Sequence, residues 1–137
     1  MAIKRFLISI ILMVLLTIST TMVFGDDTKI IAYYFHGNAR CPTCHKMEQY
    51  TKETIWQNFK DELTNGLLVL KVVNVEEKEN EHFVDDYQLY TKALIISRVE
   101  NGKEIQHKNL TKIWEYVRDK KKFSNYVTTE INDYLKE

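Results

Sequence analysis

The sequence predicts an α/β fold in which a central, mixed, four-stranded sheet is flanked by helices. Three observations carry this prediction: short runs rich in β-branched and aromatic residues, helical apolar stripes between them, and one strong hairpin signal. The expected element order is β-α-β-α-β-β-α, followed by an extra C-terminal helix. A helical crossover makes the first two strands parallel, whereas Asn101-Gly102 makes the last two strands an antiparallel hairpin.

The first half of this order is read from apolar spacing. A buried strand is expected at Ile30–Phe35, and a single helix is expected to begin near Cys41 or Pro42 and to end at Asn65-Gly66. The apolar stripe of this helix is formed by Cys44, Met47, Thr51, Ile55, Phe59 and Leu63. The run Leu67–Val75 is almost wholly aliphatic, which is typical of an interior strand covered on both faces.

The second half contains the hairpin and three further helices. A helix is expected over about Asn80–Leu89, with Asn80 as its N-cap. Strands are expected at Ala93–Val99 and, as a returning edge strand, at Lys103–His107. The last two helices are expected over about Leu110–Val117 and about Lys121–Leu135, each with an apolar side.

Size and charge limit the possible functions. The chain has 137 residues, enough for one domain. It carries 19 basic and 19 acidic residues; without residues 1–25, which contain Lys4 and Arg5, the balance is 17 to 19, a net charge of −2. This near-neutral balance gives no support for nucleic acid as a partner.

The N-terminal segment is predicted to direct export. Residues 1–25 begin with the positive pair Lys4-Arg5 and continue as an apolar run, as in a cleaved signal peptide. An uncleaved membrane anchor is the alternative, because residues 6–24 carry no charge over a length that is marginally sufficient to cross a bilayer. In either case residues 26–137 form the domain, which we expect in the periplasm or on the extracytoplasmic face of the membrane.

Both cysteines of the chain lie in the motif Cys41-Pro42-Thr43-Cys44. A bridge between residues three apart closes almost no loop, so its stabilising value is small. The pair is therefore expected to be reactive or metal-binding. Its position between a buried strand and a helix start favours thiol redox chemistry.

The two cysteines are predicted to have different roles. Cys41 lies at the helix N-terminus, where unpaired N–H groups, the helix dipole and the neighbouring Arg40 should lower the pKa of its thiol. Cys44 lies one turn deeper and should be less exposed. Cys41 is thus the expected nucleophile and Cys44 the resolving thiol, while Pro42 stiffens the turn between them and Thr43 completes the motif.

His36 and Arg40, which lie near the motif, can each be interpreted either as part of the site or as a residue without a functional role. His36 closes the first strand and is a candidate for stabilising the thiolate or carrying a proton, although a histidine that merely ends a strand is the alternative. Arg40 is either part of the site or an ordinary solvated charge. We interpret Tyr33 and Tyr34 as packing residues, and Glu48 and Glu53 as solvated surface charges.

Other chemistry remains open for the same motif. With His45, the run Cys41–His45 matches the Cys-x-x-Cys-His attachment signature of c-type haem. Two thiolates with His36 or His45 are also a candidate zinc or copper site. A third alternative is a redox-inert subunit of a larger reductase system. The buried-strand and helix context favours the redox pair, with no cofactor and no metal.

The sequence resembles the thioredoxin-like superfamily at Tyr33–Cys44. It is more similar still to a small exported branch, the nitrophenyl compound nitroreductase subunit ArsF family. The supporting segments are Met47-Glu48, Asn74–Glu76, His82–Val84, Asp86–Leu89, Asn109–Trp114 and Phe123–Val127. The resemblance covers about residues 30–135 and implies a thioredoxin-like fold with a Cys41–Cys44 redox pair. The family name suggests a multisubunit system, but the chain has no Gly-rich phosphate loop for flavin or nicotinamide.

Two departures from the superfamily pattern change the expected site. Thioredoxins carry a cis-proline facing the disulfide, and here Thr91 or Lys92 takes that place with an expected trans bond. We therefore expect Thr91 and Lys92 to contact the substrate, which is a protein disulfide or dithiol partner or a small molecule. Thioredoxins also bury an acidic residue in the first strand; Ile30–Phe35 has none, and His36 is the nearest replacement. Arg40 stands where the superfamily usually has tryptophan.

Overall fold

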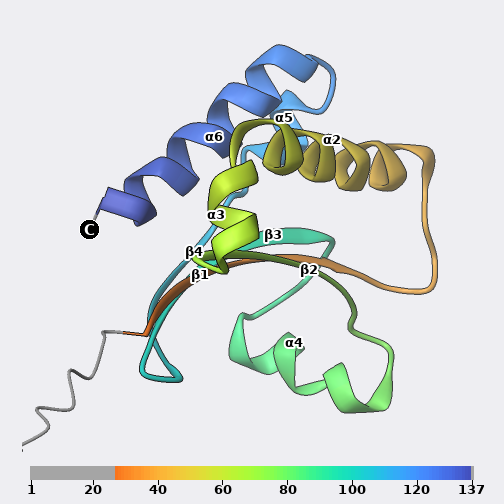
Figure 1. Ribbon diagram of the computed structural model, residues 1–137. Helices are drawn as coiled ribbons and strands as arrows, with labels where there is room; N and C mark the ends of the chain where they lie inside the picture. Colours follow the sequence, from red (N-terminus) through yellow and green to blue (C-terminus); the bar gives the residue numbers. More distant parts are fainter. Residues whose placement is uncertain (1–26, 137) are drawn as a thin grey trace, which may run out of the picture.

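The computed structural model describes residues 27–136, which form one sheet with helices on both faces (Figure 1). The strands are β1 (Thr28–His36), β2 (Leu68–Asn74), β3 (Ala93–Glu100) and β4 (Lys103–Asn109). The helices of this part of the chain are α2 (Pro42–Asn58), α3 (Lys60–Asn65), the short 3₁₀ helix η1 (Lys78–Asn80), α4 (His82–Asp86), α5 (Ile113–Tyr116) and α6 (Lys120–Lys136).

The strand order is β2-β1-β3-β4. Strand β1 is parallel to β2 and antiparallel to β3, and β3 is antiparallel to β4. This mixed sheet, with the α2 and α3 crossover between β1 and β2, is the predicted thioredoxin-like α/β fold. The extra C-terminal helix is also confirmed, since α6 follows α5.

Strand β1 divides the interior into two apolar clusters. Its alternating side chains point to opposite faces of the sheet. Ala32 and Tyr34 join the larger cluster beneath α2, α5 and α6, and Tyr33 and Phe35 join the smaller cluster on the side of α4. Figure 1 shows the same division, with α2, α5 and α6 above the sheet and α4 below it. All four side chains are buried, so the strand that leads into the cysteine motif is held from both sides.

The prediction that the second strand is interior was wrong. Strand β2 lies at an edge of the sheet, and its Lys71 and Val72 are exposed. An aliphatic run can reflect a high propensity to form a strand and not only burial on both faces. The position of a strand in the sheet depends on which strands it pairs with, and these lie far away in the sequence. The Lys71 ammonium lies 5.5 Å from the centre of the Tyr33 ring, so this exposed position still covers an aromatic side chain.

The single helix expected from Cys41 to Gly66 is divided at Phe59. Helix α2 ends at Asn58 and α3 begins at Lys60, while Phe59 itself has φ −132° and ψ 38°. The Phe59 side chain is buried in the larger cluster. The backbone thus leaves helical geometry at this residue while its ring remains in the core. The predicted end at Asn65-Gly66 is confirmed, because Gly66 takes the left-handed conformation with φ 80°.

The helix expected over Asn80–Leu89 is shorter, and Asn80 is not its N-cap. Residues 78–80 form η1, and α4 begins at His82. The Asn80 side-chain amide donates to the Asn74 carbonyl at 3.0 Å, so this residue closes the turn after β2 instead. The hairpin signal is confirmed: Asn101 and Gly102 both have positive φ, 51° and 78°.

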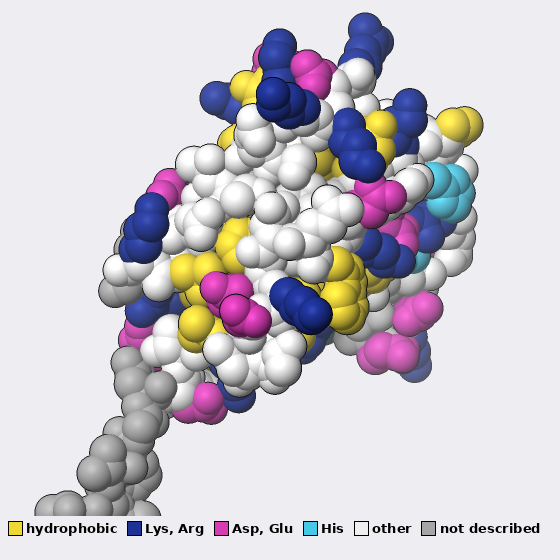
Figure 2. Space-filling view, turned by 45° about the horizontal axis from the view of Figure 1, so that its top comes forward, with side chains coloured by type: hydrophobic (Ala, Val, Ile, Leu, Met, Phe, Trp, Pro, Cys, Tyr) yellow, Lys and Arg dark blue, Asp and Glu magenta, His cyan; other side chains and the backbone are white. Residues whose placement is uncertain are grey.

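On the face of the molecule formed by α2, α5 and α6, basic side chains are interspersed with acidic and apolar ones (Figure 2). Ion pairs between elements account for part of this pattern. The Lys120 ammonium of α6 lies 2.5 Å from the Glu53 carboxylate of α2, and Lys108 of β4 pairs with Glu130 of α6 at 2.6 Å. The interpretation of Glu53 as a merely solvated charge was therefore wrong, since it joins two helices.

The predicted signal peptide or anchor, residues 1–25, lies outside the described residues. Within residues 27–136, no helix is both long enough and apolar enough to cross a membrane.

Candidate redox site

Cys41 is the N-cap residue of α2, as the sequence predicts. Its backbone is extended, with φ −82° and ψ 161°, and Pro42 follows as the first helical residue. Proline fits this place because its fixed φ suits the helix and its missing N–H would have no intrahelical partner. Strand β1 ends at His36, so a short turn connects the sheet to the helix start that presents the cysteine motif.

The two cysteines form a disulfide, with their Cα atoms 5.0 Å apart. Cys41 is exposed, whereas Cys44 is only 2% exposed. The Cys44 backbone N–H donates to Cys41 Sγ at 3.1 Å. The exposed cysteine is thus the one whose sulfur accepts a hydrogen bond in the first turn of the helix, and the predicted difference in exposure between Cys41 and Cys44 is confirmed.

Tyr34 connects the site to the sheet. Its hydroxyl donates to the Cys44 carbonyl at 2.8 Å, and the side chain is fully buried. Burial raises the pKa of Tyr34 to about 12, against the smaller opposing effect of the Arg40 charge. The phenol therefore stays protonated, and remains a donor, at any pH where thiols exchange. The sequence interpretation took Tyr34 as packing only; the available signal is that a buried tyrosine usually needs a partner for its hydroxyl.

Arg40 forms an ion pair with Glu48, and both side chains are largely buried, at 22% and 13% exposed. Glu48 also accepts from Lys52 at 2.6 Å, one helical turn further along α2. Glu48 is therefore not a free surface charge, which corrects its interpretation as solvation. The pairing leaves Arg40 next to the motif but compensates part of its positive charge.

His36 lies at the end of β1, and its Nδ1 is 3.1 Å from the Gly37 carbonyl oxygen. Since a carbonyl only accepts, this nitrogen carries the proton. The hydrogen bond of His36 goes to the backbone of its own turn and to neither sulfur. No hydrogen bond therefore connects the His36 side chain to the cysteines in a way that would support its proposed proton-carrying role. Its position fits the alternative, a histidine that merely ends a strand.

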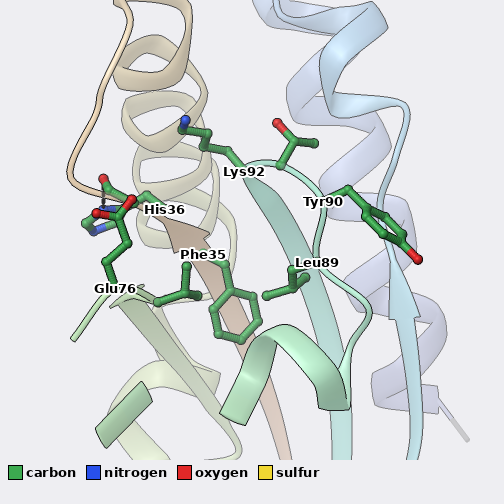
Figure 3. A pocket seen from close by; sticks show the side chains of 9 residues that line it. Phe35, His36, Glu76, Leu89, Tyr90 and Lys92 are labelled. Carbon is green, nitrogen blue, oxygen red and sulfur yellow. Dashed lines mark hydrogen bonds between the residues drawn. The ribbon is translucent and has the colours of Figure 1, made fainter. Parts of the chain in front are cut away.

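A cavity of about 170 Å³ lies between the end of β1 and the segment before β3. It brings His36 together with Thr91 and Lys92, the two residues expected to contact the substrate. Figure 3 shows the Lys92 side chain directed toward the side of His36, while Tyr90 points away. Glu76 completes the charged lining. All peptide bonds in the described residues are trans, as expected for Thr91 and Lys92.

Gly37 lies against the Glu76 carboxylate beside this cavity. A Cβ atom at this residue would clash with Glu76 Oε1, so a larger side chain would displace the carboxylate. The same junction is tied by the Val75 N–H, which donates to the His36 carbonyl at 2.9 Å. The ends of β1 and β2 are therefore fixed relative to each other where the cavity opens.

A second cavity of about 180 Å³ lies on the other side of the segment before β3. It is lined by Tyr90, Thr91 and Lys92 together with Trp114 of α5. The Trp114 indole N–H donates to the Lys92 carbonyl at 3.1 Å, which holds this segment in place. Tyr90, which lines both cavities, is 93% exposed. Sequence reasoning assigned neither Tyr90 nor Trp114 to the site.

Within residues 27–136, the structure shows no feature that supports the haem or metal alternative. His45 is exposed, and both sulfurs that a thioether or metal bond would need are joined to each other. Among residues 27–136, no group of three or more His, Cys, Asp or Glu side chains is placed to hold a metal ion.

No protein-family model matches the chain, and no curated protein matches it. The solved structures that are similar include three with a TM-score of 0.40 each. The X-ray structure of Fasciola hepatica thioredoxin is 18% identical over 66% of this chain and 79% of its own. The solution structure of a thioredoxin from Thermus thermophilus is 16% identical over 66% and 72%, and a malarial protein is 14% identical over 67% and 96%.

Proposed function

We propose that this chain is an exported thiol–disulfide oxidoreductase that exchanges electrons through Cys41 and Cys44. The observation that carries the proposal is the asymmetry of the pair: one exposed sulfur at the N-terminus of a 17-residue helix and one buried sulfur a turn away, at disulfide distance. A helix N-terminus lowers the pKa of a thiol. The first sulfur is therefore both reachable and activated, and the second is protected from competing partners.

The proposed exchange has two steps. In the reduced protein, the Cys41 thiolate attacks one sulfur of a partner disulfide, and the partner's other sulfur leaves as a thiolate that takes up a proton. The Cys44 thiol then loses its proton and attacks Cys41 Sγ, which forms the Cys41–Cys44 bond and releases the second partner sulfur. The protein loses two electrons and the partner disulfide gains them. The reverse sequence oxidises a partner dithiol.

The partner is a protein disulfide or dithiol, or a small molecule with the same chemistry. Thr91 and Lys92, which line both cavities beside the segment before β3, are proposed to contact it. The resemblance to the nitrophenyl compound nitroreductase subunit ArsF family adds a multisubunit setting, in which this chain supplies thiol chemistry and not direct nitro reduction. With export through residues 1–25, and residues 6–24 as the alternative membrane tether, the exchange takes place outside the cytoplasm.

The test uses disulfide reduction of insulin by the reduced protein. Cys41→Ser should abolish turnover, and Cys44→Ser should stop the reaction at a mixed disulfide on Cys41, visible as an added mass that dithiothreitol removes. His45→Ala should retain turnover, because its exposed side chain has no step in the exchange. Turnover that survives Cys41→Ser would overturn the proposal, and a haem absorption band lost in His45→Ala would support the haem alternative instead.

A further inference from the structure

We propose that Tyr34 is a positioning residue for the resolving cysteine, acting through its hydrogen bond to the Cys44 carbonyl. The inference rests on the proposed thiol–disulfide exchange and adds to it a residue outside the cysteine motif. Tyr34 lies ten positions before Cys44, on a different element, and donates to it across the interface between sheet and helix.

The hydroxyl of Tyr34 is held in place by the rigid centre of the fold. Tyr34 belongs to β1, where it pairs with Val72 of β2 on one side and Leu94 of β3 on the other. Its side chain is fully buried in the larger apolar cluster. A buried ring in a central strand has little freedom, so the position of the oxygen is set by the sheet and not by the motif.

Cys44, in contrast, lies in the first turn of α2. The first turn of a helix has N–H groups without intrahelical partners, and the Cys44 N–H donates to Cys41 Sγ. That sulfur is the atom that reacts. When Cys41 is bonded to a partner, the Cys41–Cys44 disulfide is absent. The hydrogen bond from the Cys44 N–H then ends on a sulfur that carries the partner. The bond from Tyr34 is independent of both, because it ends on a backbone carbonyl.

The hydrogen bond from Tyr34 to Cys44 should affect the second step of the exchange. In that step the Cys44 thiolate attacks Cys41 Sγ, the Cys41–Cys44 bond forms and the partner sulfur leaves with the electron pair. The rate of such an intramolecular attack depends strongly on how well the reacting atoms are held in position. By fixing the Cys44 backbone against the sheet, Tyr34 keeps the attacking sulfur near its target. The first step, attack by the exposed Cys41, does not depend on this contact.

The phenol remains suited to this role throughout the reaction. Burial raises the pKa of Tyr34, so the hydroxyl keeps its proton while the thiols ionise. Tyr34 therefore acts as a donor and not as a base that takes the Cys44 proton.

The test compares Tyr34→Phe with Tyr33→Phe. Both changes remove one phenol oxygen from the same strand and keep the ring, but Tyr33 faces the smaller cluster on the opposite side of the sheet. Reduced protein is mixed with oxidised glutathione and quenched with acid, and the glutathionylated form is followed by mass spectrometry. Tyr34→Phe should accumulate this form and close the disulfide about two- to tenfold more slowly, the range expected for one hydrogen bond. Tyr33→Phe should match the wild type.

A second measurement separates positioning from general loosening. In a Cys44→Ser background, the rate of glutathionylation at Cys41 should be the same with and without Tyr34→Phe, because only the first step occurs. Equal ring closure in all variants, or an equal slowing of both steps by Tyr34→Phe, would overturn the inference while leaving the exchange reaction intact. A wild type that does not exchange with oxidised glutathione or insulin would overturn the proposed function and this inference with it.

Discussion

At the residue scale, the charges around Cys41 determine how readily its thiol ionises. The N-cap position supplies unpaired backbone N–H groups and the positive end of the helix dipole. Arg40 adds a positive charge beside the motif, but its ion pair with Glu48 compensates part of it. The reactivity of Cys41 should therefore depend on Glu48, which lies about two turns into the helix and has no direct part in the exchange.

Replacing Glu48 by Gln should lower the pKa of the Cys41 thiol. The substitution removes the negative charge that offsets Arg40, so the thiolate is better stabilised. Glu48 acts on the thiol only indirectly, through Arg40, and one pKa unit corresponds to about 1.36 kcal/mol, so the decrease should be smaller than about 1 unit. Thiolate absorbance followed against pH, in a Cys44→Ser background, measures it.

Glu53→Gln is the matched control for this prediction. Glu53 lies on the same helix and also loses an ion-pair partner, Lys120 of α6. Its ion pair does not involve Arg40, so the pKa of Cys41 should not change. A rise in the Cys41 pKa on Glu48→Gln, or equal decreases in both variants, would contradict the assignment of Glu48 to the site.

Spacing alone predicts the cysteine roles but not the residues that support them. Two cysteines three apart at a helix start differ in depth by one turn, so the exposed and buried assignments follow from helix geometry. Tyr34 reaches the site through the packing of α2 on the sheet, and Glu48 through its ion pair with Arg40. Local patterns specify neither contact. The one local signal was chemical, since a tyrosine in an otherwise apolar strand needs a partner for its hydroxyl.

At the element scale, the break at Phe59 shows a conflict between helical continuity and core packing. The apolar stripe continues through Phe59 to Leu63, so spacing predicts one helix. In the structure, α2 and α3 meet at Phe59, whose ring is 2% exposed in the larger cluster. The Phe59 N–H still donates to the Ile55 carbonyl at 3.0 Å. The junction has no side-chain cap on α3, so we expect burial of the Phe59 ring to be its main source of stability.

Phe59→Ala should lower the free energy of unfolding by about 3–5 kcal/mol, because it removes a fully buried ring and leaves a cavity. Trp56→Ala is the control, since Trp56 lies in the last turn of α2, next to the junction, but is 63% exposed; its effect should be within about 0.5 kcal/mol. Urea unfolding followed by far-UV circular dichroism measures both. Similar losses in the two variants would show that burial of Phe59 is not what stabilises the junction.

Which segments form strands was easier to predict from the sequence than where each strand lies in the sheet. The β1, β3 and hairpin segments have local signals in their β-branched residues and in Asn101-Gly102. Which strand lies at an edge depends on pairing across the whole sheet, and β2 received an interior assignment from its aliphatic composition alone. Lys71 was the one charged residue in that run and indicated an exposed face.

At the scale of the whole molecule, buried and partly buried phenols should make the fold sensitive to alkaline pH. Burial raises the pKa of Tyr33, Tyr34, Tyr87 and Tyr126, and for Tyr87 the hydrogen bond to Glu104 adds to it. Below the ordinary pKa of about 10, all four phenols are protonated in both states. Above it, the unfolded chain releases protons that the folded chain retains, so the free energy of unfolding falls as pH rises.

Urea unfolding at about pH 9 and at about pH 11, on either side of the ordinary tyrosine pKa, should therefore give a lower stability at the higher pH. Tyr34→Phe should show a shallower decrease, because Phe cannot release a proton in the unfolded state. Tyrosine ionisation, followed by phenolate absorbance, should lag behind that of free tyrosine. A stability independent of pH across this interval would contradict the burial of these hydroxyl groups.

A redox titration shows whether Cys41 and Cys44 form a reversible redox pair. The protein is equilibrated in glutathione or dithiothreitol buffers spanning about −320 to −120 mV, the range of thiol–disulfide proteins and their compartments. Free thiols are then alkylated and counted by mass. We expect a single reversible two-electron transition between zero and two alkylated cysteines. A pair that stays fully oxidised or fully reduced across the whole range would contradict it.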